Sequence, residues 1–196
     1  MRDTVKLVAH GLATIAVLPA LVSYYIRSGL FGRDRALEGS SQALALIPGL
    51  IGDYCRRAFL TQVLGGFARS ATVQFGTIFS QASAVIESGV YVGPRCHIGR
   101  VHIEKDVLLA AGVHIPSGPM THSFGDLDQP IREQGGEKIT VRIGEGSWIG
   151  SAAVVLADVG KHCIVGAGAV VTKPLPDYAV AAGVPARVIR TRVAGG

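Results

Sequence analysis

A polar stretch between residues 118 and 140 gathers the side chains best suited to acid–base chemistry. It contains His122, Asp126 and Asp128. An imidazole titrates near neutral pH, so it can accept a proton from an attacking group in a transition state. Either aspartate can orient such an imidazole or bind substrate hydroxyls, and either can equally form a turn beside Gly125. We therefore expect a functional loop with His122 as its candidate base; a neutral insertion with a loose histidine is the alternative.

The elements that position this loop show a six-residue period. Aliphatic residues recur at this spacing on both sides of the loop, which fits neither a 3.6-residue helix nor a lone strand. The period predicts a coil with three short strands per turn, in which the first residue of each hexad points inward. The residue after it is often Gly, either because the corner needs a positive φ or because a Cβ has no room there. The positions of the series, small at Ser80 and otherwise aliphatic, are Val73, Ser80, Ile86, Val92, Ile98, Ile103, Leu109, Ile115, Ile143, Ile149, Val155, Val159, Val165 and Val171.

The N-terminal third has a different composition. Residues 7–26 carry no formal charge and end in two tyrosines, with Arg27 and further arginines following. Twenty apolar residues match the thickness of a bilayer core, so this run is expected to span a membrane, to lie on one, or to pack on the rest of the protein. Asp53–Leu60 reads as a short amphipathic helix with Arg56 and Arg57 in water or at a headgroup surface.

These patterns divide the chain into three parts. Residues 1–66 form an apolar helical region, residues 67–192 form the repeat domain with the loop at 118–140, and residues 193–196 form a tail. The net charge of +5 is spread without a basic cluster, which argues against nucleic-acid binding. The three cysteines lie far apart, which favours a reducing compartment over disulfides or a zinc knuckle.

Three C-terminal motifs resemble the hexapeptide-repeat acyltransferases of the galactoside, maltose and streptogramin acetyltransferase type. They are Trp148-Ile-Gly-Ser151, the run from Val165 to Lys173, and the run from Tyr178 to Arg190. The resemblance implies a mainly β fold, a left-handed parallel β-helix, here preceded by the α-helical region. It also implies a homotrimer with active sites between subunits, acetyl-CoA as the acyl donor and no metal.

The resemblance carries roles over to individual residues. His122 matches the general base that takes the proton of an acceptor hydroxyl in a ternary complex, and Arg95, Asp126 and Asp128 are expected to contact the acceptor. The residues that match the CoA contacts are Trp148, Ser151, Ala167, Thr172, Lys173, Arg187 and Arg190.

The predicted activity is transfer of an acetyl group to a hydroxyl of a sugar or glycan-like acceptor. The apolar N-terminal region suggests a lipid-linked or exported glycan, polysaccharide biosynthesis, membrane contact through residues 1–60, and a cytoplasmic location at the inner membrane face. N-acetylation of an amino sugar is the nearest alternative.

Two readings of other classes stay open. One is a gamma-carbonic-anhydrase-like metalloenzyme, and the other is a non-catalytic trimeric scaffold. The metalloenzyme would draw its ligands from His97, His102, His114 and His122.

Overall fold

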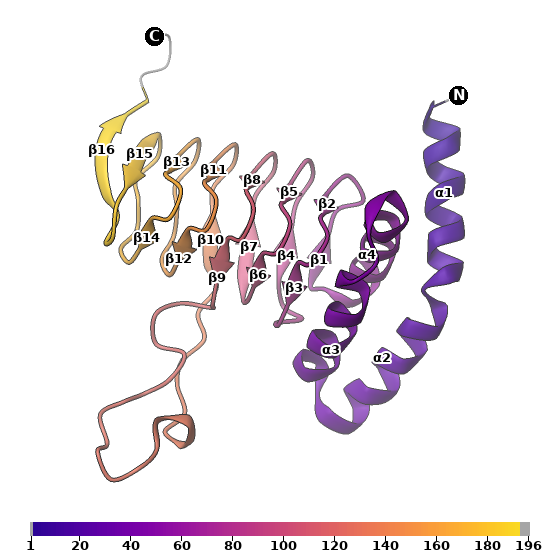
Figure 1. Cartoon of the computed structure of the whole chain (residues 1–196), viewed down its shortest axis with the longest axis horizontal. Coiled ribbons are helices and arrows are strands. Elements are labelled where there is room, and N and C mark those ends of the chain that lie inside the picture. Colours follow the sequence, from indigo (N-terminus) through magenta and orange to yellow (C-terminus); the bar gives the residue numbers. More distant parts are fainter. Residues whose placement is uncertain (1, 193–196) are drawn as a thin grey trace.

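The computed structural model describes residues 2–192, with side chains from residue 9 onward, and the proposed tail lies outside this range. Four helices precede a β-solenoid of about six turns (Figure 1). The expected parallel β-helix with a helical N-terminal region is confirmed. The helices are α1 (Arg2–Ala16), α2 (Leu18–Phe31), α3 (Arg33–Ala45) and α4 (Gly49–Val63).

Three parallel sheets form the faces of the solenoid. Sheet A joins β1 (Gly66–Phe67), β4 (Val85–Ile86), β7 (Val101–Ile103) and β10 (Val141–Ile143). Sheet B joins β2 (Thr72–Val73), β5 (Tyr91–Val92), β8 (Leu108–Leu109), β11 (Trp148–Ile149), β13 (Ile164–Val165), β15 (Ala179–Ala182) and the antiparallel β16 (Arg187–Thr191). Sheet C joins β3 (Ile78–Phe79), β6 (His97–Ile98), β9 (His114–Ile115), β12 (Val154–Val155) and β14 (Val170–Val171). The chain runs A to B to C in each turn, so we call the corners the A/B, B/C and C/A edges.

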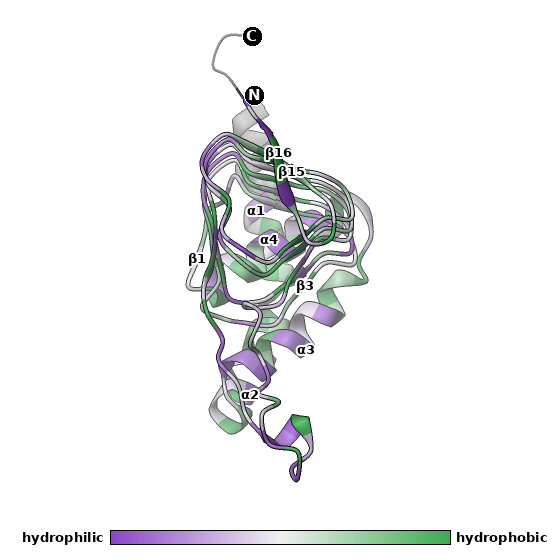
Figure 2. Ribbon diagram, turned by 90° about the vertical axis from the view of Figure 1, so that its left-hand side faces the viewer, coloured by the Kyte–Doolittle hydropathy of each residue, from purple (hydrophilic) through white to green (hydrophobic). Residues whose placement is uncertain are grey.

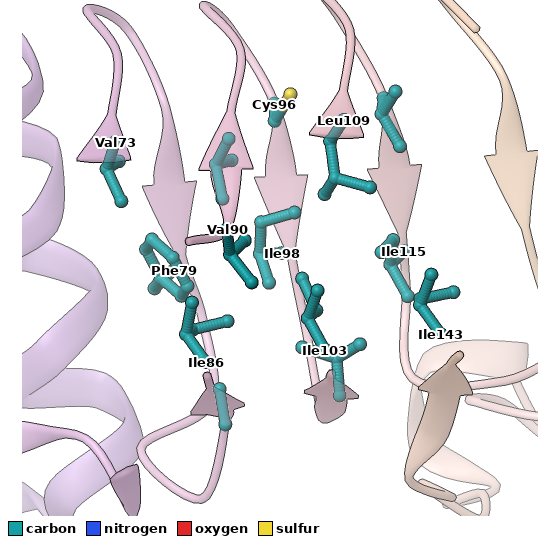
Figure 3. Packing of buried hydrophobic residues seen from close by; sticks show 14 of the residues in the cluster. Val73, Phe79, Ile86, Val90, Cys96, Ile98, Ile103, Leu109, Ile115 and Ile143 are labelled. Carbon is teal, nitrogen blue, oxygen red and sulfur yellow. The ribbon is translucent and has the colours of Figure 1, made fainter. Parts of the chain in front are cut away.

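The hexad prediction holds along the solenoid except at Ser80, which was expected inward; Phe79 takes the inward position and Ser80 lies outside it. The aliphatic residues that open the hexads are at most 2% exposed and stack from turn to turn (Figure 3). The small residues at the fifth position, such as Cys96 and Ala153, share this interior and are also buried. Backbone groups of successive turns pair in parallel register, so each turn closes the hydrogen bonds of the previous one.

The glycines after the inward residues have one of the two expected causes. A Cβ on Gly144 would lie 2.5 Å from the backbone of Gly160 in the next turn, and one on Gly150 would lie 2.5 Å from the amide of Ala167. Close approach of the turns therefore excludes a side chain there. The positive φ angles occur two residues later, at positions such as Gly146 and Gly168.

The long apolar run does not form one helix. It breaks at Val17, because α1 ends at Ala16 and α2 begins at Leu18 with Pro19 in its first turn. Among the described helices, no single one is long and apolar enough to cross a membrane. By length and composition alone, Ala9–Ala16 and Leu18–Phe31 could do so as a pair bent by 48°. Part of the run is buried, including Tyr24, whereas one row stays exposed: Leu18, Val22, Ile26 and Leu30.

A buried guanidinium joins the helices to the first turn of the solenoid. Arg56 is 2% exposed, so its expected place in water or at a headgroup surface was wrong. It donates to the carbonyls of Leu44, Ile47 and Val73 and pairs with Asp53 at 2.6 Å. Three carbonyls and one carboxylate satisfy the charge that burial would otherwise penalise.

One continuous core passes from the helices into the solenoid. Phe59 of α4 and Phe79 of β3 are both fully buried in it, and α3 and α4 pack on β1, β2 and β3. Seen along the solenoid, the excursion loop and α2 extend to the same side of the molecule (Figure 2). The first turn is thus covered by helices, and α3 lies where it can share a cavity with the loop.

Candidate active site

His122 lies in the loop that leaves sheet C after β9 and enters sheet A at β10, on the C/A edge. The loop does not interrupt the solenoid, because β7 and β10 still pair directly, with Val101 opposite Val141. Two backbone hydrogen bonds fix the segment on either side of the histidine, from the amide of Glu137 to the carbonyl of Met120 and from the amide of Ser123 to that of Gly135. His122 therefore extends from a constrained stem of the loop.

The stem requires a glycine opposite the histidine. A Cβ at Gly136 would lie 2.2 Å from the carbonyl oxygen of Thr121 and 2.7 Å from the amide nitrogen of His122. Only a residue without a side chain lets the two strands of the stem approach this closely. The sequence thus sets the backbone position of His122 through a residue fourteen positions away.

The imidazole lines a cavity of about 390 Å³ between the loop stem, helix α3 and the turn after β3. His122 is exposed, so it is reachable from solvent. The lining residues are Asp34, Arg35, Glu38, Ser80, Gln81, Pro116, Ser117, Thr121, His122 and Lys138. Five of these residues lie before or within the first turn of the solenoid, so the cavity joins distant parts of the chain.

The cavity offers hydrogen-bond acceptors beside two cationic side chains, Arg35 and Lys138. Gln81 is 3% exposed, and its Oε1 has no hydrogen-bond partner, while its Nε2 donates to the Ser80 carbonyl. One carboxylate oxygen of Asp34 accepts the amide of Ala82 at 2.9 Å, which leaves the other for a ligand. Glu38 is half-buried on the same face of α3. Hydroxyl groups of a ligand are the natural donors for such a set.

The sequence analysis did not identify these helix residues or Gln81. Their only signal is the polar segment around Asp34 and Glu38 within an otherwise apolar region. That segment becomes informative only once the fold places α3 beside the loop.

The other expected acceptor contacts are not brought to His122 in the chain. Asp126 accepts the amide of Asp128 at 2.9 Å, which forms a turn at the loop tip, and neither residue lines the cavity. Arg95 is exposed on the B/C edge with a positive φ of 59°. The structure therefore places all three away from the imidazole.

The residues expected to contact CoA are divided between two edges. Ser151 and Ala167 lie in stacked turns on the B/C edge, where the amide of Gly168 donates to the Ser151 carbonyl at 2.8 Å. Thr172 and Lys173 follow β14 on the C/A edge and are exposed. Trp148 points outward from sheet B, and Arg187 and Arg190 lie on the exposed β16. Sheet C separates Ser151 and Ala167 from the edge that carries His122.

The remaining histidines and the thiols have structural positions. His97 and His114 face each other on sheet C with ring centroids 6.1 Å apart, and His102 on sheet A binds Glu87 at 2.7 Å. Within the described residues, no three His, Cys, Asp or Glu side chains gather into a metal-binding group. Burial raises the pKa of the Cys96 thiol and of the Cys163 thiol, which keeps both protonated and unreactive.

A solenoid of stacked hexads with one histidine-bearing loop defines the chain as a hexapeptide-repeat protein. Residues 140–173 match the family model described as the hexapeptide repeat of succinyl-transferase. The fold is similar to a maltose O-acetyltransferase from Clostridium difficile, with a TM-score of 0.65 at 24% identity over 82% of this chain and 89% of the other. It is also similar to a galactoside acetyltransferase solved with coenzyme A, with a TM-score of 0.53 at 23% identity over 81% and 82% of the two chains.

Curated relatives give the same assignment at higher identity. The chain is 38% identical to a probable acetyltransferase of Mycobacterium tuberculosis over 47% of this chain and 31% of the relative. It is 34% identical to the galactoside O-acetyltransferase of Escherichia coli over 55% of this chain and 61% of the relative. In both cases it covers less than two thirds of the relative. The chain is thus similar to hexapeptide-repeat acetyltransferases in sequence and in fold.

Proposed function

We propose that this protein is an acetyl-CoA-dependent O-acetyltransferase that acts on a hydroxyl group of a sugar or glycan-like acceptor. The observation that carries the proposal is the cavity that holds His122 beside the carboxylates of α3 and the unpartnered Oε1 of Gln81. It places an imidazole, which can act as a general base, beside acceptors that suit a ligand with several hydroxyls. The galactoside O-acetyltransferase relatives and the CoA complex of a related fold support the choice of donor and acceptor class.

In this proposal His122 removes the proton of the acceptor hydroxyl as its oxygen attacks the thioester carbonyl. The C–S bond then breaks, and CoA leaves as a thiolate that takes up the proton from the imidazolium. A hydroxyl is a weak nucleophile at neutral pH, so proton removal in the transition state is the step that needs a base. In this proposal both substrates are bound together, and the acetyl group passes directly from the thioester to the acceptor oxygen.

The acceptor is held by α3 and the turn after β3. Its hydroxyls donate hydrogen bonds to Asp34, Glu38 and Gln81. The hydroxyl that donates to Oε1 of Gln81 satisfies a buried oxygen that is otherwise unpaired. This assignment adds α3 to the acceptor contacts. Arg95, Asp126 and Asp128 would reach the acceptor only from a neighbouring subunit.

The donor site is proposed to need a second copy of the chain. Ser151 and Ala167 lie at one border of sheet C and His122 lies at the other, so one chain cannot present both to the same acetyl group. A homotrimer brings the B/C edge of one prism next to the C/A edge of its neighbour. Trp148, Thr172 and Lys173 then flank the pantetheine arm, and Arg187 and Arg190 supply charge for the nucleotide phosphates.

We also propose that the reaction takes place in the cytosol, where acetyl-CoA is made and used.

The more specific form of the proposal is that the acceptor is a lipid-linked or exported glycan. It rests on the exposed apolar row along α2, namely Leu18, Val22, Ile26 and Leu30. A fragment that lacks residues 1–66 cannot test it, because that fragment also loses Asp34 and Glu38. Val22→Ser and Ile26→Ser should each slow transfer to a lipid-linked glycan and leave transfer to a soluble sugar unchanged, and equal effects on both acceptors would overturn this more specific form.

The test is thioester cleavage with acetyl-CoA and a panel of sugars, for wild type and His122→Ala. We expect the substitution to lower kcat by roughly 10²–10⁴-fold, because general-base catalysis contributes about that much. His102→Asn is the matched control, since His102 lies outside the cavity and its loss should leave kcat unchanged. Equal rates for wild type and His122→Ala would overturn the proposed role.

The same assay separates the alternatives. An N-acetylated product resists mild alkali, whereas an O-acetyl ester is hydrolysed, so product stability distinguishes an amino-sugar acceptor from a hydroxyl. A scaffold without chemistry would cleave no thioester with any acceptor. A metalloenzyme would lose activity on chelation, whereas general-base catalysis by His122 would not.

A further inference from the structure

A second cavity, of about 660 Å³, lies at the other end of the molecule from the C-terminal strands, between α1, α4 and the turn that leads into β2. Its lining residues are His10, Leu50, Asp53, Tyr54, Arg57, Arg69, Ser70 and Thr72. The turn at residues 69–70 belongs to the A/B edge, whereas His122 lies on the C/A edge. The two cavities share no residue.

The described groups of this cavity carry a surplus of positive charge. Asp53 is its one acidic residue, and both carboxylate oxygens are already taken, by Arg56 at 2.6 Å and by Gln74 at 3.1 Å. Arg57 and Arg69 have no ion pair with any carboxylate among the described side chains. Two guanidinium groups therefore face the cavity without a counter-charge.

The cavity also offers hydrogen-bond donors. The Nε of Arg57 is buried without a partner, while its Nη2 donates to the Thr72 hydroxyl at 3.2 Å and its guanidinium lies 5.3 Å from the centre of the Tyr54 ring. The hydroxyl of Ser70 accepts the amide of Gly89, which leaves its proton free to donate. Donors fixed on a helix and a solenoid turn can bind a multivalent oxyanion without large rearrangement.

The ionisation of His10 is consistent with this potential. Burial lowers the pKa of its imidazole, and the charges of Arg69 and Arg57 lower it further. The two guanidinium groups are therefore close enough to act on a neighbouring charge.

We propose that this cavity binds a phosphate-bearing ligand, with Arg57, Arg69, Ser70 and Thr72 as its contacts. A tetrahedral phosphate offers several acceptors to the converging donors, and the volume leaves room for an organic group against Leu50 and Tyr54. The phosphate belongs either to a free organic phosphate or to the headgroup of an anionic phospholipid. The proposal does not depend on acetyl transfer, because the cavity is separate from the one that holds His122.

The test is titration calorimetry with inorganic phosphate at constant ionic strength, on wild type, Arg69→Gln and Arg57→Gln. Removal of either charged donor should weaken phosphate binding by at least about tenfold, as expected for a charge-assisted hydrogen bond. Arg132→Gln removes the same charge from the loop tip, where Arg132 is exposed beside Glu133, and should change nothing. Arg69 is exposed and without a hydrogen bond to the rest of the fold, so its variant stays informative if Arg57→Gln unfolds.

A parallel flotation assay with phosphatidylglycerol and phosphatidylcholine vesicles identifies the source of the phosphate. Flotation with the anionic vesicles that is lost in Arg69→Gln assigns the site to a lipid headgroup. Phosphate binding without flotation assigns it to a free organic phosphate. No heat with phosphate for wild type, or the same affinity in wild type and Arg69→Gln, overturns the proposal. Since none of these variants touches the cavity of His122, loss of phosphate binding with normal acetyl transfer separates this proposal from the previous one.

Discussion

Gln81 is the side chain whose chemistry is least explained by stability. Its amide is almost fully buried, yet Oε1 has no partner, which is costly unless a ligand supplies a donor. Gln81 lines the cavity of His122, where a bound ligand can supply the missing donor. It therefore provides a direct test of where the acceptor binds.

We predict that Gln81→Met raises the KM for the acceptor by roughly fivefold, the value of one ordinary hydrogen bond. The KM for acetyl-CoA should stay the same, because the residue is assigned to the acceptor. The free energy of unfolding should change by less than about 1 kcal/mol, since the lost bond to Ser80 is offset by removal of an unpaired oxygen. Steady-state kinetics with each substrate varied in turn measures this, and Gln62→Met on the exposed side of α4 is the control. An unchanged acceptor KM would remove Gln81 from the site.

The candidate site was only partly predictable from single residues. His122 was accessible because it stands in a polar break of a regular repeat. Asp34, Glu38 and Gln81 were not, because no spacing links a helix residue to a loop almost ninety positions later. Arg56 was misplaced for a related reason. Its burial depends on three backbone carbonyls whose convergence the sequence does not encode locally.

Among the elements, β7 and β10 keep the solenoid continuous at the loop. They pair directly although the loop is inserted just before β10. Glu104, directly after β7, accepts Nε of Arg142 in β10 at 2.6 Å and the amide of Glu145 at 2.9 Å. Burial by itself would raise the pKa of the Glu104 carboxyl, but the Glu145 amide and the Arg142 guanidinium outweigh it and hold the pKa below its usual 4.5. The carboxylate thus ties β7 to β10, the strand that the chain enters after the loop.

We predict an acid-sensitive contribution to stability from this contact. Because the pKa of Glu104 is lower in the folded state, the unfolded chain takes up a proton first as the pH falls. The contribution of this contact to the free energy of unfolding is therefore complete above pH 4.5 and is lost as the pH falls through the folded-state pKa. The midpoint temperature of thermal unfolding should therefore fall more steeply on acidification for wild type than for Glu104→Gln. Glu133→Gln removes an exposed carboxylate at the loop tip and should follow wild type. Parallel pH profiles for wild type and Glu104→Gln would contradict the assignment.

Element boundaries followed the sequence where local sterics decide them. The inward hexad positions and the glycines after them were predictable, because a narrow interior and close turns act on each residue directly. The apolar run was not resolved into α1 and α2, since its hydropathy is continuous across Val17 and only Pro19 marks the restart. Side-chain volume and hydropathy therefore predicted the solenoid better than they predicted the helices.

For the whole molecule, the division of the expected CoA contacts between two edges has a consequence for assembly. If neighbouring prisms meet at both borders of sheet C, that sheet faces the axis of the trimer. The outward positions of sheet C are Ile78, His97, His114, Val154 and Val170, and those of sheet A include Val85, His102 and Arg142. The two faces differ in the guanidinium of Arg142, which suits a face in solvent better than a face shared between chains.

We predict that Val154→Glu separates the trimer into single chains, because an unpaired carboxylate would be buried at the axis. Val85→Glu places the same charge at a half-buried outward position of sheet A and should leave the assembly intact. Sedimentation equilibrium gives the mass of each variant, and acetyl transfer should be lost together with the trimer. A full-sized assembly for Val154→Glu, or dissociation by Val85→Glu alone, would show that the prisms meet differently.

The two ends of the solenoid limit what kind of assembly is possible at all. A bare terminal coil would offer its unpaired amides and carbonyls to the terminal coil of another molecule, and repeated addition of that kind yields fibres. At one end α3 and α4 cover the first coil, and at the other β16 turns back antiparallel and carries Arg187 and Arg190. The covered ends disfavour lengthwise polymerisation and leave the faces of the solenoid for the contacts of the proposed trimer.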